Sequence, residues 1–120
     1  HTRLTKLTRE QFDSEIKRTQ DLIGPRGSKC LRPPYGAINS EVRGWADAGG
    51  YPIALWDVDT LDWKRGPAQQ IADQVIKGAA PGQVVLMHDG GGNRANTVAA
   101  LEIVLRELSG QGWTFEAMCD

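Results

Sequence analysis

Three short motifs place ionisable, aromatic and rigid residues directly after apolar segments of this chain. They are Arg-Pro-Pro-Tyr-Gly at residues 32–36, Asp-Thr-Leu-Asp-Trp at residues 59–63 and Leu-Met-His-Asp at residues 86–89. Each apolar segment is short enough to be a strand, and α/β folds build active sites from residues at the carboxyl ends of their strands. Together the motifs supply a guanidinium, carboxylates, an imidazole and an indole, a set suited to acid–base catalysis.

His88 is a candidate general acid. A carboxylate beside one ring nitrogen would fix the tautomer of the imidazole and make it a competent proton donor, and Asp62 is the candidate partner. By strand alternation Leu86 shares a face with His88 and would place an apolar surface beside the proton donor. A purely structural histidine is the better interpretation of His88 taken alone, but three such motifs on successive strands favour catalysis.

The other two motifs suggest substrate and oxyanion contacts. Two prolines stiffen the turn after Arg32 and carry no N–H, so the guanidinium is held where it can pair with a carboxylate. The N–H of Tyr35 is the first free donor after this turn and suits an oxyanion. Trp63 sets an apolar wall beside the Asp62 carboxylate. The structural alternatives are an arginine–carboxylate pair, an aspartate that caps a turn and a tryptophan that covers the core.

Alternating helix and strand patterns predict the scaffold. A capping box begins the first helix at Thr8, and Asn39 or Ser40 caps the second. The alternation predicts an α/β fold with a parallel sheet. The predicted elements are helix 8–23, strand 28–32, helix 39–48, strand 52–58, a helix with Pro67 in its first turn that ends at Gly78, strand 83–87, a helix capped by Asn93 or Asn96 that ends at Gly110, and strand 113–118.

Composition narrows the classes of protein. The chain has 120 residues, of which 40% are hydrophobic and 24% charged, as expected for one globular domain. Its net charge is −1 and its basic residues are scattered, which argues against a nucleic-acid partner. No apolar run approaches the length of a membrane span.

Two cysteines, Cys30 and Cys119, are present. Their number fits either two free thiols in a reducing compartment or one disulfide in an oxidising one. Because Cys30 lies near the start of the first predicted strand and Cys119 follows the last, both could lie at one rim of a barrel, which favours a bridge. In the chain-entropy model, closing a loop of about 90 residues contributes about 4 kcal/mol.

In order and spacing, the three motifs resemble those of the polysaccharide deacetylases, the NodB-type carbohydrate esterases. The resemblance covers His1 to about Asp120 and implies that residues 1–120 belong to a single domain. It implies an α/β fold that is the carboxyl-terminal part of a distorted (β/α) barrel with mostly parallel strands. It also implies a secreted or cell-wall-associated enzyme that hydrolyses N-acetyl groups of chitin or peptidoglycan, or O-acetyl groups of xylan, with a divalent metal, usually zinc and sometimes cobalt.

The resemblance implies a role for each motif. Arg32 would orient the catalytic-base carboxylate, and the Tyr35 N–H would help the metal hold the oxyanion. A metal-bound water, deprotonated by an aspartate upstream, would attack the acetyl carbonyl. Asp62 would tune His88, which would protonate the leaving amine or alcohol.

Two more roles follow from the resemblance, with one departure. Trp63 and Leu86 would enclose the acetyl methyl group, and His1 matches the last histidine of the family's His-x-x-x-His metal motif. The family's Asp-Asp motif, its first metal histidine and the opening strands would lie upstream of His1. Because a zinc site needs three protein ligands and this chain offers one there, we expect activity to require the missing N-terminal part of the same domain.

Two other functions remain alternatives. A free amino-terminal His1 together with His88 could chelate copper, as in oxidative polysaccharide enzymes, although the alternating pattern argues against it. The chain could instead be a non-catalytic glycan-binding remnant that keeps Trp63 and Tyr35 for stacking on sugars.

Overall fold

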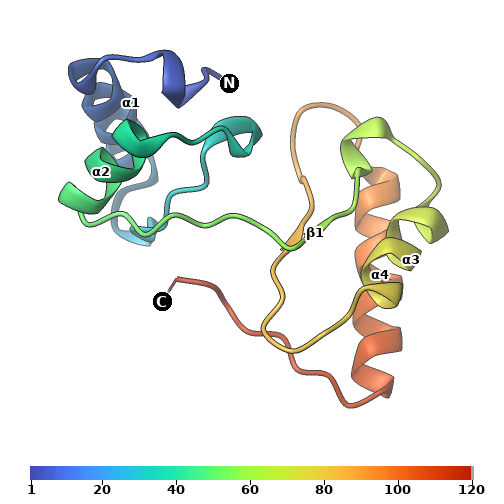
Figure 1. Ribbon diagram of the computed structural model, residues 1–120. Coiled ribbons are helices and arrows are strands. Elements are labelled where there is room, and N and C mark those ends of the chain that lie inside the picture. The colour runs from blue at the N-terminus through green and yellow to red at the C-terminus, as the bar shows by residue number, and fades with distance from the viewer. Residues whose placement is uncertain (120) are drawn as a thin grey trace. The chain divides into compact units, whose positions relative to one another are not determined.

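The computed structural model describes residues 1–119, which form two compact units (Figure 1). The first unit contains His1–Leu55 and the chain from Ala117, and the second contains Trp56–Glu116. The first unit holds the helices α1 (Arg9–Ile23) and α2 (Ser40–Ala48). The second holds the strands β1 (Val58–Asp59) and β2 (Val85–Leu86) and the helices α3 (Ala68–Lys77) and α4 (Ala95–Gly110).

Local signals fix the ends of α1. The Thr8 hydroxyl accepts a hydrogen bond from the Gln11 N–H at 3.3 Å, and the Gln11 side chain accepts one from the Thr8 N–H at 2.9 Å. This is the predicted capping box, which satisfies two N–H groups that the helix leaves free. Gly24 ends the helix with a φ of 63°, a conformation that favours glycine.

The first unit packs α1 and α2 against the start of the chain. Asn39 caps α2 by accepting a hydrogen bond from the Val42 N–H at 2.9 Å. Phe12 of α1 is buried, and its ring lies 5.6 Å from that of Trp45 in α2. The segment that carries Arg32 joins this unit through a parallel bridge between Leu31 and Ile53. The buried residues of this core are Leu4, Phe12, Val42 and Ala46.

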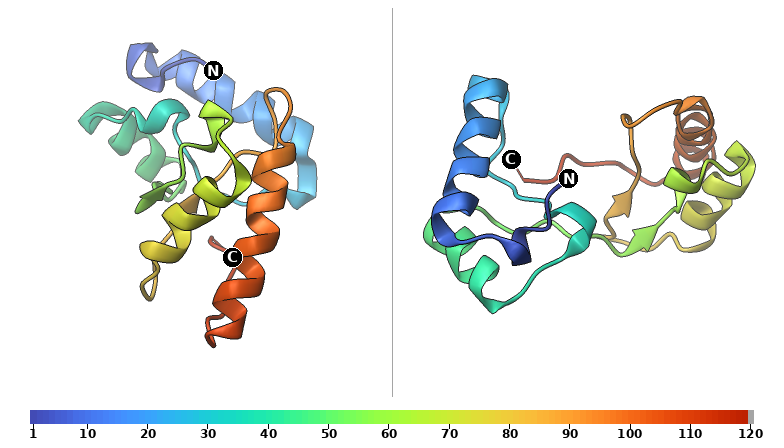
Figure 2. Two further views of the ribbon diagram at one scale, coloured as in Figure 1. Left: turned by 90° about the vertical axis from the view of Figure 1, so that its right-hand side faces the viewer. Right: turned by 90° about the horizontal axis from the view of Figure 1, so that it is seen from above.

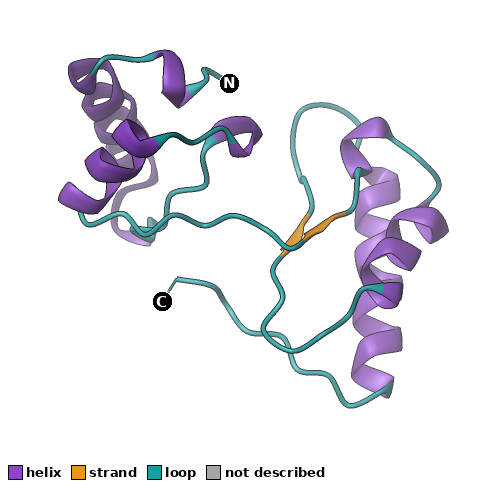
Figure 3. Cartoon of the chain, viewed as in Figure 1, coloured by secondary structure: helices purple, strands orange, loops and turns teal. Residues whose placement is uncertain are grey.

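The second unit pairs two short strands and packs two helices. The strands β1 and β2 are parallel, with Val58 opposite Val85 and Asp59 opposite Leu86 (Figure 3). The helices α3 and α4 lie side by side in both views of Figure 2 and make the main helix–helix contact of the chain. Their shared core contains Ile71, Ala72, Val75, Ala100, Val104 and Leu108.

The strands are much shorter than the sequence predicts. Strand 28–32 is reduced to the bridge at Leu31, strand 52–58 to the bridge at Ile53 and the start of β1, and strand 83–87 to β2. The predicted strand 113–118 is wrong, because the described part of that segment contains no strand. A segment becomes a strand only when a neighbour pairs with it, and a two-stranded sheet gives each segment one neighbour.

Two predicted helix starts also differ. Pro67 is the N-cap of α3 and does not lie inside its first turn. The N-cap of α4 is Arg94, not Asn93 or Asn96, although the Asn93 side chain still accepts a hydrogen bond from the Ala95 N–H at 2.9 Å. Asn93 therefore satisfies a free helix N–H from the position directly before the N-cap.

Two further observations concern the cysteines and the length of the helices. The Sγ atoms of Cys30 and Cys119 lie 2.03 Å apart, within the first unit, and a disulfide between them stays a prediction for thiol titration to test. Among the described helices, none combines the length and the apolar character needed to cross a membrane.

Candidate active site

The Asp62 carboxylate is the centre of a buried polar cluster in the second unit. Asp62 is only 1% exposed, and its carboxylate accepts three hydrogen bonds. Oδ1 lies 2.7 Å from Nδ1 of His88, while Oδ2 accepts from the His88 N–H at 2.8 Å and from the Thr97 hydroxyl at 3.0 Å. Both oxygens are therefore held by donors, and the plane of the carboxylate is fixed.

This contact assigns the two nitrogens of His88. An ionised carboxylate can only accept hydrogen bonds, so Nδ1 carries the proton that faces Asp62. The other ring nitrogen, Nε2, is left to exchange a proton with a ligand. Because the His88 side chain is 35% exposed, solvent and a substrate can reach the ring. The structure thus brings together the pair that the sequence suggests, with the geometry of an oriented acid–base histidine.

The strand ends explain why Asp62 and His88 meet. The Thr60 hydroxyl donates to the Leu86 carbonyl at 2.7 Å and so joins the ends of β1 and β2. Asp62 then begins a single helical turn, Asp62–Lys64, flanked by Leu61 and Arg65 in left-handed conformations with φ values of 53° and 60°. This tight turn carries the Asp62 side chain back toward the segment after β2.

The start of α4 encloses the other side of the pair. Arg94 donates through Nε to the Gly90 carbonyl at 2.7 Å and through Nη1 to the Asp62 carbonyl at 3.4 Å. These bonds join the loop after His88 to the Asp62 turn. Thr97 lies in the first turn of α4, so the carboxylate also faces the positive end of the helix dipole.

The environment keeps Asp62 ionised. Burial alone raises the pKa of a carboxyl group, because the charged form loses its water. The hydrogen bonds from the His88 side chain, the His88 backbone and the Thr97 hydroxyl act in the opposite direction, and the pKa of Asp62 lies below its ordinary value. At neutral pH Asp62 is therefore an anion that can support a proton on His88.

The two apolar candidates of this unit differ in exposure. Trp63 is 50% exposed, and the Lys64 ammonium lies 5.2 Å from the centre of its ring. Leu86 is buried and is the last residue of β2. Strand alternation therefore does not extend from Leu86 to His88, and an enclosure of an acetyl methyl group by Trp63 and Leu86 stays a prediction.

Arg32, Tyr35 and His1 lie in the first unit. The exposed guanidinium of Arg32 contacts the Met118 sulfur at 3.7 Å, and among the described residues no carboxylate lies within ion-pair distance of it. Tyr35 adopts φ 62°, its hydroxyl donates to the His1 carbonyl at 3.1 Å, and its N–H has no acceptor among residues 1–119. A free N–H on a stiff turn keeps the oxyanion role open.

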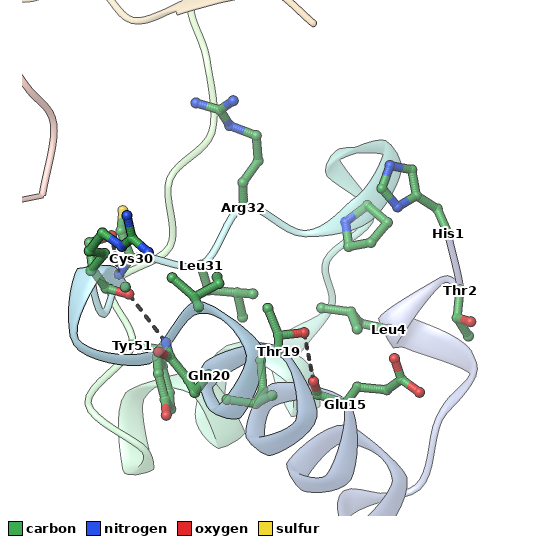
Figure 4. A pocket seen from close by; sticks show the side chains of 16 residues that line it. His1, Thr2, Leu4, Glu15, Thr19, Gln20, Cys30, Leu31, Arg32 and Tyr51 are labelled. Carbon is green, nitrogen blue, oxygen red and sulfur yellow. Dashed lines mark hydrogen bonds between the residues drawn. The ribbon is translucent and has the colours of Figure 1, made fainter. Parts of the chain in front are cut away.

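His1 and Arg32 line one cavity of about 620 Å³ (Figure 4). The cavity lies beside α1, and Leu4 and Leu31 give it an apolar part. Hydrogen bonds to backbone carbonyls hold Thr19 and Gln20 of α1 on its wall. The proposed metal ligand and the proposed base-orienting guanidinium therefore share one opening of the first unit.

The described residues do not fit a complete metal site. No group of three His, Cys, Asp or Glu side chains within residues 1–119 is arranged to hold an ion. Zinc in a hydrolase needs three protein ligands, so His1 would need two more from outside the described residues.

The sequence did not predict two residues of this cluster, Thr97 and Arg94. The glycine triplet before them suggests only a flexible loop. One feature of the sequence could have identified Thr97. It continues the spacing of the buried apolar residues of α4, and a buried polar side chain needs a hydrogen-bond partner.

Comparison with known proteins finds similarity to polysaccharide deacetylases. A family model described as polysaccharide deacetylase matches residues 1–54. The peptidoglycan-N-acetylglucosamine deacetylase PgdA of Listeria monocytogenes is 37% identical over 118 residues, which cover 96% of this chain and 24% of that protein. The bifunctional xylanase/xylan deacetylase of Cellvibrio japonicus is 36% identical over 115 residues, which cover 93% of this chain and 17% of that protein.

Solved structures agree with these matches. The Bc1960 peptidoglycan N-acetylglucosamine deacetylase superposes with a TM-score of 0.90 at 31% identity, over 98% of this chain and 57% of that one. The family 4 carbohydrate esterase of Streptomyces lividans superposes with a TM-score of 0.82 at 39% identity, over 93% of this chain and 58% of that one. The chain thus spans less than a quarter of the two curated relatives and just over half of the two solved chains. Its α/β fold is part of a deacetylase barrel, and the chain belongs to the polysaccharide deacetylase family.

Proposed function

We propose that this chain supplies the acid-donating part of a domain that hydrolyses acetyl groups on a polysaccharide. The observation that carries the proposal is the pair formed by Asp62 and His88. The buried carboxylate occupies Nδ1 of the imidazole at 2.7 Å and leaves Nε2 of a partly exposed ring for a substrate.

The chemistry follows from that nitrogen. Hydrolysis adds water to the acetyl carbonyl, and the tetrahedral intermediate collapses when its C–N or C–O bond to the sugar breaks. The departing amine or alkoxide needs a proton, which the protonated His88 gives from Nε2. The Asp62 anion supports the positive charge of the imidazolium, and acetate leaves. General acid catalysis of this kind contributes about 10²–10⁴-fold in rate.

The remaining groups belong partly to this chain and partly to residues outside it. The Tyr35 N–H would donate to the oxyanion, and Arg32 would orient a carboxylate base that this sequence does not contain. A divalent metal, zinc or alternatively cobalt, would polarise the carbonyl when bound, with His1 as one ligand. The base and the other ligands would come from the N-terminal part of the same domain.

The names of the relatives support two substrate classes. One curated relative and one solved structure are named as deacetylases of peptidoglycan N-acetylglucosamine, and another relative is named as a xylan deacetylase. N-acetylated amino sugars and O-acetylated xylose both carry an acetyl carbonyl with a sugar leaving group. Since these polymers are outside the cell, we propose a secreted or wall-associated location.

Acetate release by the complete protein that contains this chain tests the proposal. We expect acetate from peptidoglycan, N-acetylated chito-oligosaccharide or acetylated xylan, and loss of that release with a chelator. His88→Ala should lower kcat about 10²–10⁴-fold and leave metal content unchanged. Sugar binding without acetate release would favour a binding remnant, and copper- and peroxide-dependent sugar oxidation would favour a copper site at His1. Either result contradicts the proposal.

A further inference from the structure

We propose that Thr97 is a positioning residue, which holds the Asp62 carboxylate in the one orientation that directs Oδ1 at Nδ1 of His88. The effect of Thr97 on turnover rests on the function proposed above. Its effect on the contact between Asp62 and His88 does not.

The two carboxylate oxygens have different donors. Among residues 1–119, Oδ1 meets only the imidazole, at 2.7 Å. Oδ2 meets two donors from different segments, the His88 N–H at 2.8 Å and the Thr97 hydroxyl at 3.0 Å. Two donors on Oδ2 resist rotation about the Cβ–Cγ bond of Asp62 better than one, and any such rotation would move Oδ1 away from the ring.

Thr97 is suited to this position because α4 holds it firmly. It is 6% exposed and shares the buried face of α4 with Ala100, Val104 and Leu108, the residues that pack on α3. The spacings of three, four and four residues place all of them on one side of the helix. The core of the second unit therefore fixes the position from which the hydroxyl donates.

The hydroxyl also has a cost that its bond to Asp62 offsets. Threonine lowers helix propensity, and a buried hydroxyl without a partner destabilises a protein. In α4 the Thr97 hydroxyl donates across the unit to a carboxylate 35 residues away in sequence. A hydrogen bond to an ionised acceptor is stronger than a neutral one.

The test compares Thr97→Val with Thr97→Ser in the chain of residues 1–120. Valine keeps the shape of threonine and removes the hydroxyl, whereas serine keeps the hydroxyl. Thr19→Val is the matched control, because Thr19 is also a helical threonine but its hydroxyl donates to the Glu15 carbonyl in the first unit. If Thr97→Val does not fold, Thr97→Ala replaces it, since alanine favours the helix.

Nuclear magnetic resonance supplies the readout. In Thr97→Val we expect the carboxyl titration of Asp62 to shift to higher pH, and the ¹⁵N spectrum of His88 to gain the Nε2–H tautomer at the expense of Nδ1–H. Thr97→Ser and Thr19→Val should keep the titration and the tautomer of the unsubstituted chain. A folded Thr97→Val or Thr97→Ala with unchanged titration and tautomer overturns the proposal, and so does a Thr97→Ser that behaves like Thr97→Val.

Kinetics of the complete protein separate this proposal from the proposed function. There Thr97→Val should lower kcat about 10-fold with little change in KM, because a less firmly held carboxylate orients the proton donor less well, and Thr97→Ser should restore it. An unchanged kcat would show that the orientation of the carboxylate does not matter for turnover and would contradict this part of the proposal. If no acetate is released at all while the spectra change as expected, the proposed function fails and the positioning by Thr97 stands.

Discussion

At the scale of single residues, the ionised state of Asp62 makes part of the stability depend on pH. Because the pKa of Asp62 is lower in the folded chain than its ordinary value of 3.8, the unfolded chain binds a proton on this group more readily. The resulting stabilisation is fully present above the unfolded pKa. It is lost as the pH falls through that value and then through the lower folded one.

Asp62→Asn tests this sign. The amide cannot titrate, so we expect the free energy of unfolding of the variant to change less than that of the unsubstituted chain when the pH falls from 7 toward 3. Urea unfolding followed by tryptophan fluorescence at several pH values measures the difference. Asp59→Asn is the control, because Asp59 is exposed at the end of β1. If Asp62→Asn and the unsubstituted chain lost stability equally as the pH falls, the lowered pKa of Asp62 would be contradicted.

The sequence predicted part of this cluster for a definite reason. Asp62 and His88 each follow a strand-like segment, so their meeting could be anticipated from the rule that parallel strands end at one edge. Thr97 and Arg94 could not be anticipated, because their bonds to Asp62 join segments more than 30 residues apart with no local pattern. Residues that orient a site from a distant element can be identified only once the packing of the elements is known.

At the scale of elements, helix signals proved more reliable than strand signals. The capping box at Thr8 and the Asn39 cap act over three residues, and the structure confirms both. Strand ladders depend on neighbours that the local sequence does not contain, and the four predicted strands are reduced to β1, β2 and the bridge between Leu31 and Ile53. The parallel direction was nevertheless correct, because a helix between two strands returns the chain to the same edge.

The packing of α4 gives a prediction at this scale. Leu108 is buried against α3, whereas Leu101 on the same helix is 43% exposed. Leu108→Ala should lower the free energy of unfolding by about 2–5 kcal/mol, and Leu101→Ala by less than about 1 kcal/mol. Denaturant unfolding of both variants measures this difference. Similar losses for the two would mean that α4 does not bury this face.

At the scale of the whole molecule, one bridge would join distant parts of the sequence. Cys30 and Cys119 are 89 residues apart in sequence. If they are bridged, thiol titration of the unfolded, unreduced chain should find no free thiol. Cys30→Ser combined with Cys119→Ser should lower the free energy of unfolding by about 2–4 kcal/mol, because the unfolded chain regains the freedom of a long loop. Two titratable thiols in protein isolated without reductant would contradict the bridge.

The division of chemistry between this chain and the rest of its domain leads to opposite expectations for the two histidines. His1 lines the cavity that Arg32 also lines, and it can give a metal only one of the three protein ligands that a zinc hydrolase needs. His88 has its Nδ1 occupied by Asp62 and is proposed to transfer a proton, not to hold a metal.

Zinc binding separates these two roles. We expect the chain of residues 1–120 to take up no stoichiometric zinc in a calorimetric titration, and the complete protein to bind one ion per domain. In the complete protein, His1→Gln should weaken zinc binding and activity together, whereas His88→Gln should lower activity and leave the zinc content intact. Loss of zinc in His88→Gln would contradict the role of His88, and full zinc binding in His1→Gln would contradict the role of His1. Both results together would reverse the two assignments. That result would move the metal site from the first unit to the pair that Asp62 and His88 form at the strand ends of the second.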